Sequence, residues 1–308
     1  MSTPYILLLG SPTDAHVAAL AQALEARGRA AVILDTAAFP ERTRVSLGEA
    51  AGSIRVDGRE LGRPAAVYVR QLHNHPLAFG VDADEAMAHD WYATLVAFRE
   101  KAEFMVSLVA RWEALGVRVY NSPRTDWLQG KPMQLAALEQ AGLPVPRTLW
   151  TNDPAALRDF AREVGRVAYK PVSGGAATRE LGPEDLLDER LAALDAAPVT
   201  FQELLPGADL RVYVIDGRVV AALQIHSSAL DFRQHEQEIH AIELPDELAR
   251  VCVRACEVIG LRWTGMDLRP DARGVAKILE LNASPMFLGF DARAGTNILG
   301  ALADALAS

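Results

Sequence analysis

Trp263-Thr264-Gly265-Met266-Asp267-Leu268 and Lys277-Ile278-Leu279-Glu280-Leu281-Asn282-Ala283-Ser284-Pro285 are two apolar, β-prone runs near the end of the chain. The turn-forming run Pro270-Asp271-Ala272-Arg273-Gly274 separates them, which predicts a β-hairpin. Because the turn lies midway between them, Asp267 falls opposite Glu280. Opposite residues share a face of a sheet, and so do residues two apart on a strand. We therefore expect Asp267, Glu280 and Asn282 on one face, and Leu268, Leu279 and Leu281 on the other face, in a core.

Asp267, Glu280 and Asn282 would present two carboxylates and an amide oxygen from one face. Hard oxygen ligands of this kind suit Mg²⁺ or Mn²⁺ held between a protein and phosphate groups. The alternative is that all three are ordinary solvated residues on a half-exposed strand. The predicted hairpin does not by itself decide between these two interpretations.

The composition favours a globular protein. The chain has 308 residues, half of them hydrophobic, which is enough for about two domains with their own cores. Its net charge of −9 argues against DNA or RNA as the main partner, because nucleic acids attract basic surfaces. No apolar run is long enough to span a membrane, and the first residues do not resemble a signal peptide. We expect a cytoplasmic protein that binds neither nucleic acid nor membrane.

The first 120 residues alternate strand-like and helix-like segments. Tyr5–Leu9 and Ala31–Leu34 are apolar runs, and the amphipathic stretch Ala15–Arg27 lies between them. A strand–helix–strand unit predicts a parallel sheet. The turn after the first strand contains the single Gly10 and lacks the GxGxxG pattern, so a dehydrogenase receives little support.

Candidate phosphate-binding residues follow the predicted strand Val167–Val172. Lys170 precedes the small residues Ser173, Gly174 and Gly175, which would let backbone N–H groups approach phosphate oxygens while the lysine adds charge. The alternative is an ordinary glycine turn.

The next predicted strand contains Gln202-Glu203-Leu204-Leu205. Its backbone could hydrogen-bond the edge of an adenine, with the apolar side chains covering the ring. The alternative is an ordinary half-buried strand.

Two arginines stand two residues after an aspartate: Arg211 after Asp209, and Arg233 after Asp231. An arginine on a strand or strand end can clamp a phosphate or a carboxylate with two hydrogen bonds. The alternative is a surface ion pair, which contributes little to stability.

A further set follows the predicted strand Ala65–Arg70. Arg70, His73 and His75 could line a substrate pocket at the end of that strand. The alternative is that the histidines lie on the surface of a loop, since their spacing matches no zinc signature.

Several short motifs follow one another along the second half of the chain. They are Asn121-Ser122-Pro123, Lys131, Ala141-Gly142-Leu143-Pro144-Val145-Pro146-Arg147-Thr148, Tyr169-Lys170-Pro171, Phe201-Gln202-Glu203, Gly207-Ala208-Asp209-Leu210-Arg211, Asp231-Phe232-Arg233, Gly265-Met266-Asp267 and Glu280-Leu281-Asn282-Ala283-Ser284-Pro285. In this order and spacing, the chain resembles the ATP-grasp ligase superfamily over roughly residues 121–289. The resemblance is strongest to the RimK-like branch, which includes ribosomal-protein glutamate ligases and relatives of glutathione synthetase.

The resemblance implies an α/β fold that becomes α+β in its C-terminal half. It implies a Rossmann-like domain preceding the grasp over residues 1–120, an ATP-grasp lid subdomain over 121–205, and a C-terminal ATP-grasp subdomain with the metal site over 206–308. ATP and Mg²⁺ (or Mn²⁺) would be the cofactors. Many relatives are dimers or tetramers, so a homo-oligomer stays open.

The resemblance also assigns roles to residues of this sequence. Arg211 and Arg233 would be catalytic, stabilising the transferring phosphoryl group, and Asp267, Glu280 and Asn282 would hold two Mg²⁺ ions. The nucleotide would be bound by Lys131, Lys170, Ser173, Gly174, Gly175, Gln202, Glu203, Leu204, Leu205 and Asp209. The substrate would contact Arg70, His73, His75 and Ser284.

The implied reaction is that of a carboxylate–amine ligase. A substrate carboxylate attacks the γ-phosphate of ATP to give an acyl phosphate, and an amine then displaces phosphate to give an amide. The substrates would be a small-molecule carboxylate and amine, with a peptide or a protein as the alternative. A non-catalytic ATP-binding module is the remaining alternative.

Two departures bear on the substrate. After Asp231-Phe232-Arg233, RimK-like proteins usually carry Ser-Asn and glycines, whereas this chain has Gln234-His235-Glu236-Gln237-Glu238-Ile239. Glutamate as a substrate therefore does not carry over. Tyr68-Val69-Arg70 is similar to a strand in ATP-grasp enzymes that cross-link ribosomal peptides through lactam or ester bonds.

Overall fold

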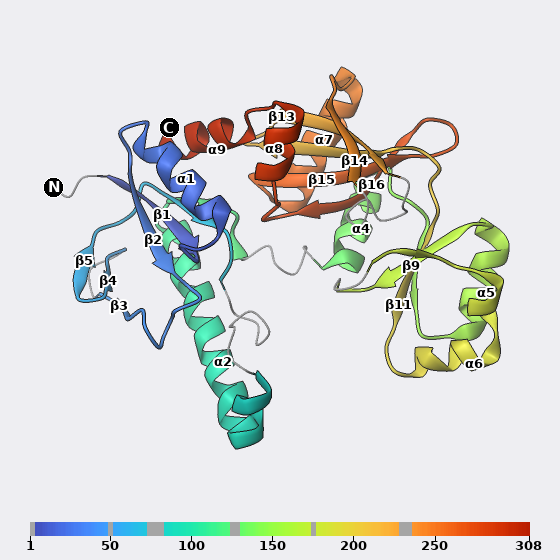
Figure 1. Cartoon of the computed structure of the whole chain (residues 1–308), viewed down its shortest axis with the longest axis horizontal. Helices are drawn as coiled ribbons and strands as arrows, with labels where there is room; N and C mark the ends of the chain where they lie inside the picture. The colour runs from blue at the N-terminus through green and yellow to red at the C-terminus, as the bar shows by residue number, and fades with distance from the viewer. Residues whose placement is uncertain (1–3, 49–51, 73–82, 124–129, 174–176, 228–235) are drawn as a thin grey trace.

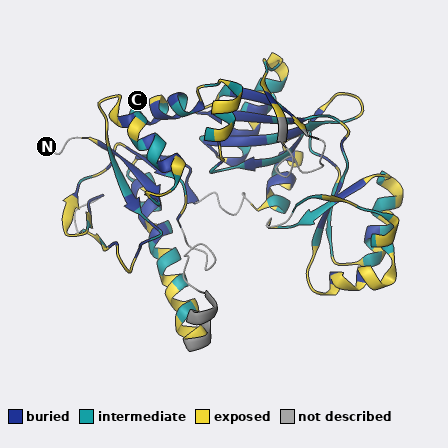
Figure 2. Cartoon of the chain, in the orientation of Figure 1, coloured by how far each residue is buried: buried dark blue, intermediate teal, exposed yellow. Residues whose placement is uncertain are grey.

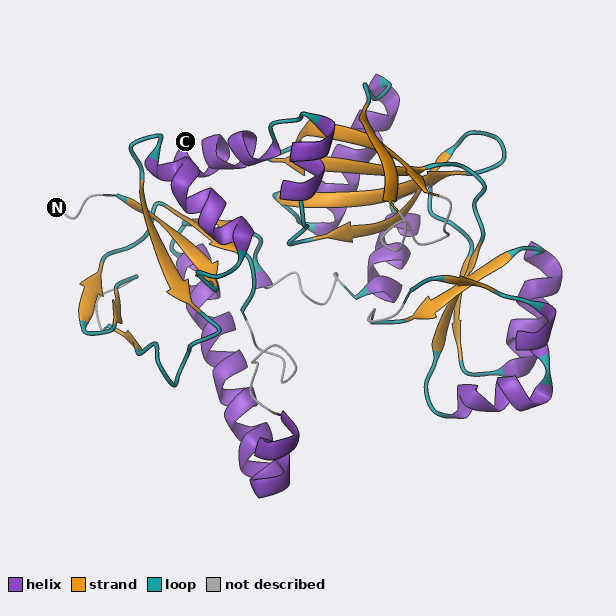
Figure 3. Cartoon of the chain, in the orientation of Figure 1, coloured by secondary structure: helices purple, strands orange, loops and turns teal. Residues whose placement is uncertain are grey.

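The chain is organised around β-sheets that follow one another along the long axis of the molecule (Figure 1). This computed structural model describes residues 4–48, 52–72, 83–123, 130–173, 177–227 and 236–308. A parallel sheet lies at one end, a small unit with β9 and β11 at the other end, and a large antiparallel sheet between them (Figure 3). The strands and helices thus combine as the α/β class predicts, with antiparallel sheets in the second half.

The N-terminal unit contains a parallel sheet with the order β2-β1-β6-β7. Its strands are β1 (Tyr5–Gly10), β2 (Ala30–Asp35), β6 (Ala66–Val69) and β7 (Arg118–Tyr120). Helix α1 (Ala15–Glu25) connects β1 to β2. It begins at Asp14, whose carboxylate accepts a hydrogen bond from the N–H of His16, and it buries Val17, Leu20 and Leu24 on one face. The predicted parallel sheet is confirmed.

Two smaller pieces complete this unit. A three-stranded antiparallel sheet consists of β3 (Val45–Leu47), β4 (Ile54–Val56) and β5 (Arg59–Leu61). Helix α2 (Ala83–Ala114) has a kink at Asp90. The C-terminal part of α2 packs Met105, Leu108, Val109 and Trp112 into a core with the parallel sheet.

The small unit at the other end of the molecule is called the central unit here, because it lies in the middle of the sequence. It is a four-stranded antiparallel sheet with the order β10-β9-β11-β8. Its elements are β8 (Thr148–Thr151), α5 (Pro154–Val164), β9 (Val167–Pro171), β10 (Arg179–Glu180), the short helices η3 (Pro183–Leu186), α6 (Asp188–Leu191) and η4 (Ala192–Asp195), and β11 (Val199–Glu203). Val167 and Phe201 face a small core with Leu157 and Leu191. Because side chains alternate along a strand, Lys170 and Gln202 face the opposite side.

The large sheet has the order β14-β13-β12-β15-β16. Its strands are β12 (Asp209–Ile215), β13 (Arg218–Ser227), β14 (Glu236–Ala241), β15 (Trp263–Pro270) and β16 (Ala276–Asn282). Helices α4 (Lys131–Gln140) and α7 (Asp246–Ile259) share an apolar core with it. Helices α8 (Leu288–Ala294) and α9 (Ile298–Ala307) contribute to a second core that also contains Tyr213 and Trp263.

Helix α9, near the end of the chain, packs against α1, near its beginning. Its buried residues Ile298, Leu302 and Leu306 lie in one core with Leu20 and Leu24 of α1. Figure 2 shows buried residues, coloured dark blue, in the parallel sheet, in α9 and in the large sheet. A shared core of this kind fixes the N-terminal unit against the large sheet.

The division into residues 1–120, 121–205 and 206–308 stays a prediction. Helix α4 shows that such a division is coarse, because Leu135 and Leu138 share a core with Val212 and Met266 of the large sheet. None of the helices within the described residues combines the length and apolar character needed to cross a membrane.

Candidate active site

The predicted hairpin is formed by β15 and β16. Asp267 pairs with Glu280, and Gly265 pairs with Asn282, so the expected register is confirmed. The side-chain amide of Asn282 lies 3.2 Å from a carboxylate oxygen of Asp267. Asp267, Glu280 and Asn282 therefore converge on one side of the sheet.

The prediction for Leu279 was wrong. The register shifts after Asp267, so that Leu268 pairs with Ile278 and Leu279 becomes an extra residue on its strand. A β-bulge of this kind redirects side chains locally. Ile278 and Leu281 are buried in the core with Leu268, whereas Leu279 lines the cavity described below.

The neighbouring strand β12 places Arg211 directly opposite Asp267. The guanidinium Nη1 of Arg211 donates to Asp267 over 2.5 Å, and the whole residue is 6% exposed. Burial opposes the charge, but the nearby Asp267 outweighs it and raises the pKa of Arg211 above its usual range. The guanidinium also lies 5.4 Å from the ring centre of Tyr213 and 6.0 Å from that of Phe290.

Gly265 makes room for this arginine. A Cβ atom at this position would lie 2.7 Å from Nη2 of Arg211 and 2.7 Å from Cβ of Pro285. Contacts this short do not occur between ordinary side chains, so any larger residue at position 265 would displace the guanidinium.

Helix α4 delivers a lysine to the other carboxylate. Nζ of Lys131 lies 3.2 Å from Glu280, and both side chains are partly exposed. One turn later, Gln134 donates to the carbonyl of Leu281 over 3.0 Å and accepts from its N–H over 2.8 Å. The side chain of Gln134 thus supplies the two hydrogen bonds that a neighbouring strand would give to Leu281. It fixes Leu281, which lies between Glu280 and Asn282 on β16.

Asp209 forms a second ion pair on the same sheet. Both of its carboxylate oxygens accept hydrogen bonds from Arg269, over 2.9 and 2.5 Å. Arg269 stands two residues after Asp267, and it therefore lies on the same face of β15. The Asp209–Arg269 pair is largely buried. It therefore differs from the surface ion pair that the sequence offered as the alternative for Asp209 and Arg211.

The nucleotide-binding candidates lie on β9 and β11. In the register, Lys170 pairs with Thr200 and Ala168 with Gln202, so Ala168, Lys170 and Gln202 share a face. The N–H groups of Glu203 and Leu204 donate to the carbonyls of Arg147 and Arg166. The carboxylate of Glu203 accepts from the N–H of Arg147 over 2.9 Å. A hydrogen bond between these two residues and an adenine would therefore use their carbonyl oxygens.

One cavity of about 710 Å³ joins these groups. Of the residues predicted from the sequence, it is lined by Lys131, Lys170, Ser173, Gln202, Glu203, Leu204, Leu205, Asp209, Arg211, Asp267, Glu280, Asn282 and Ser284. Gly174, Gly175, Arg233, His73 and His75 lie outside the described residues, and their roles stay predictions.

The cavity also contains residues that the sequence analysis missed. They are His16, Ala168, Pro171, Thr178, Arg269, Leu279, Pro285, Met286, Gly289, Phe290 and Arg293. Arg269 could have been found, because it is two residues from Asp267 on one strand. His16 gave no signal in the sequence, since it lies at the start of α1, far from the other motifs along the chain.

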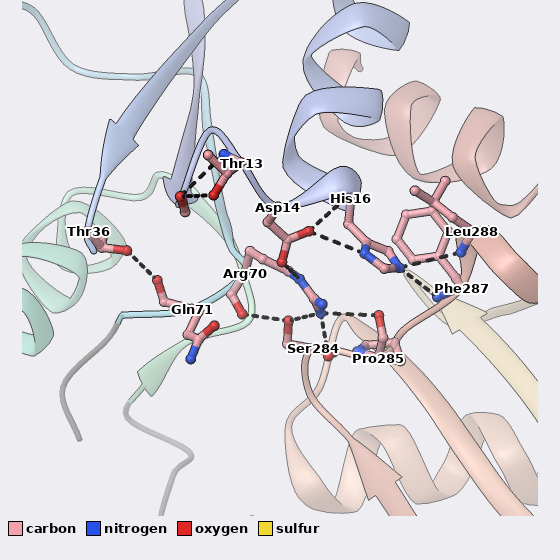
Figure 4. A network of polar contacts seen from close by, with 11 residues as sticks. Thr13, Asp14, His16, Thr36, Arg70, Gln71, Ser284, Pro285, Phe287 and Leu288 are labelled. Atoms are coloured by element: carbon pink, nitrogen blue, oxygen red, sulfur yellow. Dashed lines mark hydrogen bonds and ion pairs between the residues drawn. The ribbon is translucent and has the colours of Figure 1, made fainter. Parts of the chain in front are cut away.

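Arg70 does not line this cavity but joins the N-terminal unit to the loop after β16 (Figure 4). Its Nε donates to Asp14 over 2.8 Å, and its Nη1 donates to the carbonyl and hydroxyl oxygens of Ser284 over 2.9 and 3.1 Å. The hydroxyl of Ser284 in turn donates to the carbonyl of Arg70 over 2.7 Å. These contacts fix the cavity loop against β6.

His16 extends the same network. Its Nδ1 lies 3.2 Å from Asp14, and its Nε2 accepts from the N–H groups of Phe287 and Leu288 over 3.1 and 3.5 Å (Figure 4). Because Nε2 accepts, the imidazole is neutral and Nδ1 carries the proton. Burial, and next the charge of Arg70, lower the pKa of His16. The contacts of Arg70 outweigh burial at Asp14 and lower the pKa of that carboxyl.

The predicted metal ligands fit Mg²⁺ shared with phosphates. Within the described residues, no cluster of three or more His, Cys, Asp or Glu exists that would hold a metal alone. Asp267 and Glu280 supply two carboxylates, and Mg²⁺ is commonly held by one or two carboxylates together with substrate phosphates. Both carboxylates contact a protein cation, Arg211 or Lys131. A bound metal ion would share or replace these contacts.

The comparisons with known proteins agree with this geometry. The RimK-like ATP-grasp domain matches residues 186–306. The whole chain is similar to the ATP-grasp ligase PsnB, whose structure was solved with a phosphomimetic variant of minimal precursor, Mg and ADP. The two are 54% identical, the match covers 98% of this chain and 97% of PsnB, and the TM-score is 0.92. This chain belongs to the ATP-grasp ligases. The predicted resemblance and the predicted enzyme class are confirmed.

Other ATP-grasp relatives are more distant. A probable α-L-glutamate ligase of Teredinibacter turnerae is 28% identical over 64% of this chain and 70% of its own length. A second one, from Shewanella halifaxensis, is 26% identical, and the chain spans 46% of its length. The macrocyclase MdnC from Microcystis aeruginosa, bound with precursor peptide MdnA, has a TM-score of 0.82 at 24% identity over 98% of this chain and 99% of MdnC, which shows the shared fold.

Proposed function

We propose that this ligase uses ATP to activate a carboxylate of a peptide substrate and joins it to an amine or hydroxyl group of the same peptide. The observation that carries the proposal is the single cavity in which two lysines, two carboxylates and a buried arginine meet. The likeness to PsnB along nearly the whole chain supports a peptide substrate, since PsnB was solved with its minimal precursor.

The nucleotide end of the cavity lies between β9, β11 and the hairpin. Lys131 and Lys170 are the cations that would bind ATP phosphates, and the carbonyl oxygens near Glu203 would meet the adenine amino group. Asp267, Glu280 and Asn282 would hold Mg²⁺, or Mn²⁺ in its place. The metal ion would supply charge that offsets the negative charge developing on the phosphates.

The other end of the cavity is formed by the loop after β16 and by α8. His16, Ser284, Met286, Phe290 and Arg293 line it. An acidic side chain entering here would pass apolar groups and approach Arg211. The cavity volume lies within the usual range for ligand pockets, roughly 300–1,000 Å³, and leaves space beside a nucleotide.

Two steps follow from this arrangement. A carboxylate oxygen of the peptide attacks the γ-phosphorus of ATP, and the bond to the β-phosphate oxygen breaks to release ADP. An amine or hydroxyl of the peptide then attacks the acyl carbon, phosphate leaves, and the nucleophile loses its proton to phosphate or solvent. Arg211 would stabilise the charge on the transferring phosphoryl group, as preorganised cations do in such reactions.

The first test is a reaction with ATP, Mg²⁺ and a panel of synthetic peptides that contain acidic residues together with lysine, serine or threonine. We expect release of ADP and phosphate, and a peptide product lighter by one water. Treatment with mild alkali distinguishes the bond, because an ester regains the water and an amide does not. Glu280→Ala protein serves as the inactive control.

Two other outcomes would count against the proposal. A peptide heavier by one glutamate residue would show an activity like that in the names of the more distant relatives. ATP turnover only with pooled free amino acids or amines would show a small-molecule ligase instead.

A further inference from the structure

Asn121 belongs to a motif to which the proposed reaction gives no role. It directly follows β7, the last strand of the parallel sheet, and it is 4% exposed. Its side-chain amide donates to the carbonyls of Trp263 and Ala283, over 2.6 Å each. Its side-chain oxygen accepts from the N–H groups of Arg262 and Trp263 over 2.8 and 3.1 Å. A carboxamide has two N–H donors and an oxygen with two lone pairs, so the protein itself uses the whole capacity of Asn121.

These contacts join the two strands of the hairpin at its open end. Trp263 is the first residue of β15, and Ala283 follows the last residue of β16. The turn at residues 271–275 connects the strands at the other end. Asn121 thus holds together the end that the turn leaves open. Because Ala283 is bonded to Asn282, a shift of the Ala283 carbonyl would also move the side chain of Asn282.

The outer edge of β16 shows the same arrangement twice. Alternate residues of a strand direct their backbone groups to the same edge. At Leu281 the side chain of Gln134 binds that edge, and two residues later, at Ala283, the side chain of Asn121 binds it. Both amides are buried. Two buried carboxamides therefore take the hydrogen-bonding positions of a neighbouring strand, one on each side of Asn282.

Thr264 supports Asn282 from within the hairpin. Its hydroxyl donates to the carbonyl of Asn282 over 2.9 Å, and the residue is completely buried. The side-chain amide of Asn282 donates to the carbonyl of Gly265 and to the carboxylate of Asp267, over 3.2 Å each. A carboxamide whose nitrogen is held in this way offers its oxygen to a metal ion, which is the atom that Mg²⁺ binds.

The preceding residue anchors Asn121 on the large sheet. The hydroxyl of Tyr120 donates to Asp216 over 2.5 Å, and Asp216 accepts from Nε of Arg262 over 2.8 Å. The guanidinium of Arg262 lies 4.9 Å from the ring centre of Tyr120. These contacts fix the end of β7 against the start of β15. The last strand of the N-terminal unit therefore contributes to the geometry of the hairpin.

We propose that Asn121 and Thr264 are positioning residues for the metal ion, because they hold the backbone at residues 282 and 283 so that the side-chain oxygen of Asn282 meets it. The inference rests on the proposed function, in which Asn282 is a metal ligand. Neither positioning residue lines the cavity, so both act through Asn282. Groups that orient a metal ligand typically contribute about 10- to 100-fold to metal affinity or activity.

The test measures Mn²⁺ binding, in place of Mg²⁺, to the full chain with ADP, from the electron paramagnetic resonance signal of free Mn²⁺. We expect Asn121→Ala to raise the Mn²⁺ concentration at half-saturation about 10-fold or more. Thr264→Val removes one hydrogen bond and should raise it about 5-fold. Thr264→Ser keeps the hydroxyl and should stay close to the wild type. Calorimetry without a metal ion should give the same ADP affinity for all four proteins, since the adenine end of the cavity is untouched.

A control separates positioning from lost stability. Ile54→Ala leaves a cavity in the core of the N-terminal unit, so it lowers the melting temperature without touching these contacts. Its Mn²⁺ binding should match the wild type. A loss of Mn²⁺ affinity that Ile54→Ala shares would show an effect of stability alone and would overturn the positioning role.

Asn282→Ala separates the positioning role from the metal assignment itself. We expect it to weaken Mn²⁺ binding, and adding Asn121→Ala should cause little further loss, because the two residues act as a unit. Weaker binding in Asn282→Ala alone, with Asn121→Ala and Thr264→Val like the wild type, would overturn the positioning role and keep the metal site. Unchanged binding in Asn282→Ala would contradict the metal assignment and the positioning role together. If Asn121→Ala does not fold, equal Mn²⁺ binding by Thr264→Val and Thr264→Ser would overturn the proposal.

Discussion

Two arginine–aspartate pairs in this protein look alike and behave differently. Arg70 and Asp14 lie 2.8 Å apart where the N-terminal unit meets the large sheet, and Arg211 and Asp267 lie 2.5 Å apart in the cavity. Both arginines are largely buried and both carboxylates are about one fifth exposed. The difference lies in the remaining hydrogen bonds. Arg70 also donates to Ser284, whereas Nε of Arg211 has no hydrogen-bond partner among the described residues.

We infer from this difference that the Arg70–Asp14 pair is structural and that the Arg211–Asp267 pair is poised for a ligand. Nε and Nη1 of Arg70 donate to two different segments of the chain, so this guanidinium holds them together. A buried donor without a partner costs free energy, so it is more often found where a ligand or an ion completes the site. The distance within an ion pair therefore does not distinguish the two roles, whereas a buried donor without a partner does.

The largest expected effect is the loss of the cavity carboxylates. Asp267→Ala or Glu280→Ala should lower kcat on the order of 10³-fold or more, because the metal ion would lose a ligand and a protein cation its partner. Glu280 pairs with a partly exposed lysine, so Glu280→Ala should change the melting temperature without ATP little. Asp267→Ala should lower it, because the buried Arg211 would lose its partner. Arg273→Ala, in the turn of the same hairpin, is the control. Full activity of the Glu280 variant would refute the metal assignment.

Gln134 offers a test of the support beneath these carboxylates. Gln134→Leu removes both hydrogen bonds to Leu281 and leaves buried backbone groups without partners, so we expect a loss of about 2–4 kcal/mol in the free energy of unfolding. Denaturant unfolding checks this value, and Gln140→Leu, exposed on the same helix, serves as the matched control. An unchanged midpoint would mean that water or a shifted helix satisfies β16 equally well.

Gly265→Ala tests whether Arg211 must lie where it does. The added Cβ would displace the guanidinium, and a displacement of about 1 Å at a reacting centre can cost roughly 100-fold in rate. We expect a drop in kcat that is larger than the change in KM for ATP, since the adenine end of the cavity is untouched. Steady-state kinetics with ATP varied separates the two parameters, and equal losses in both would argue against a catalytic role for Arg211.

The smallest effect is expected at the Arg70 network. The pKa of His16 is lowered in the folded protein, so folding opposes its protonation. The stability contribution is complete above the ordinary histidine pKa of about 6.5 and is lost as the pH falls below it through the lowered folded value. His16→Gln keeps an acceptor near Phe287. It should therefore make the free energy of unfolding less dependent on pH in this acidic range, while retaining most of the stability at neutral pH. His16→Ala should cost about 1 kcal/mol there. A pH profile of unfolding identical in all three proteins would show that His16 does not couple the loop to pH.

The shared face of Asp267 and Glu280 could be predicted because it depends on local rules. Strand alternation and a turn halfway between Asp267 and Glu280 were sufficient to place both carboxylates together, and period two also places Arg269 beside them. The bulge at Leu279 could not be predicted, since it depends on how β16 meets its neighbours. His16 was not predicted, and Arg70 was predicted only as a substrate residue. The contacts of these two residues depend on Phe287 and Ser284, which lie more than 200 residues away in the sequence.

The shared core of α1 and α9 has a consequence for biosynthesis. Leu20 and Leu24 emerge early from the ribosome, but Leu302 and Leu306, which cover them, are synthesised nearly 300 residues later. Until α9 has been synthesised, the apolar face of α1 in the nascent chain therefore lacks the side chains that bury it in the folded protein. Truncations that remove α9 should then be recognised by chaperones as incompletely folded, although every residue of the candidate active site would still be present.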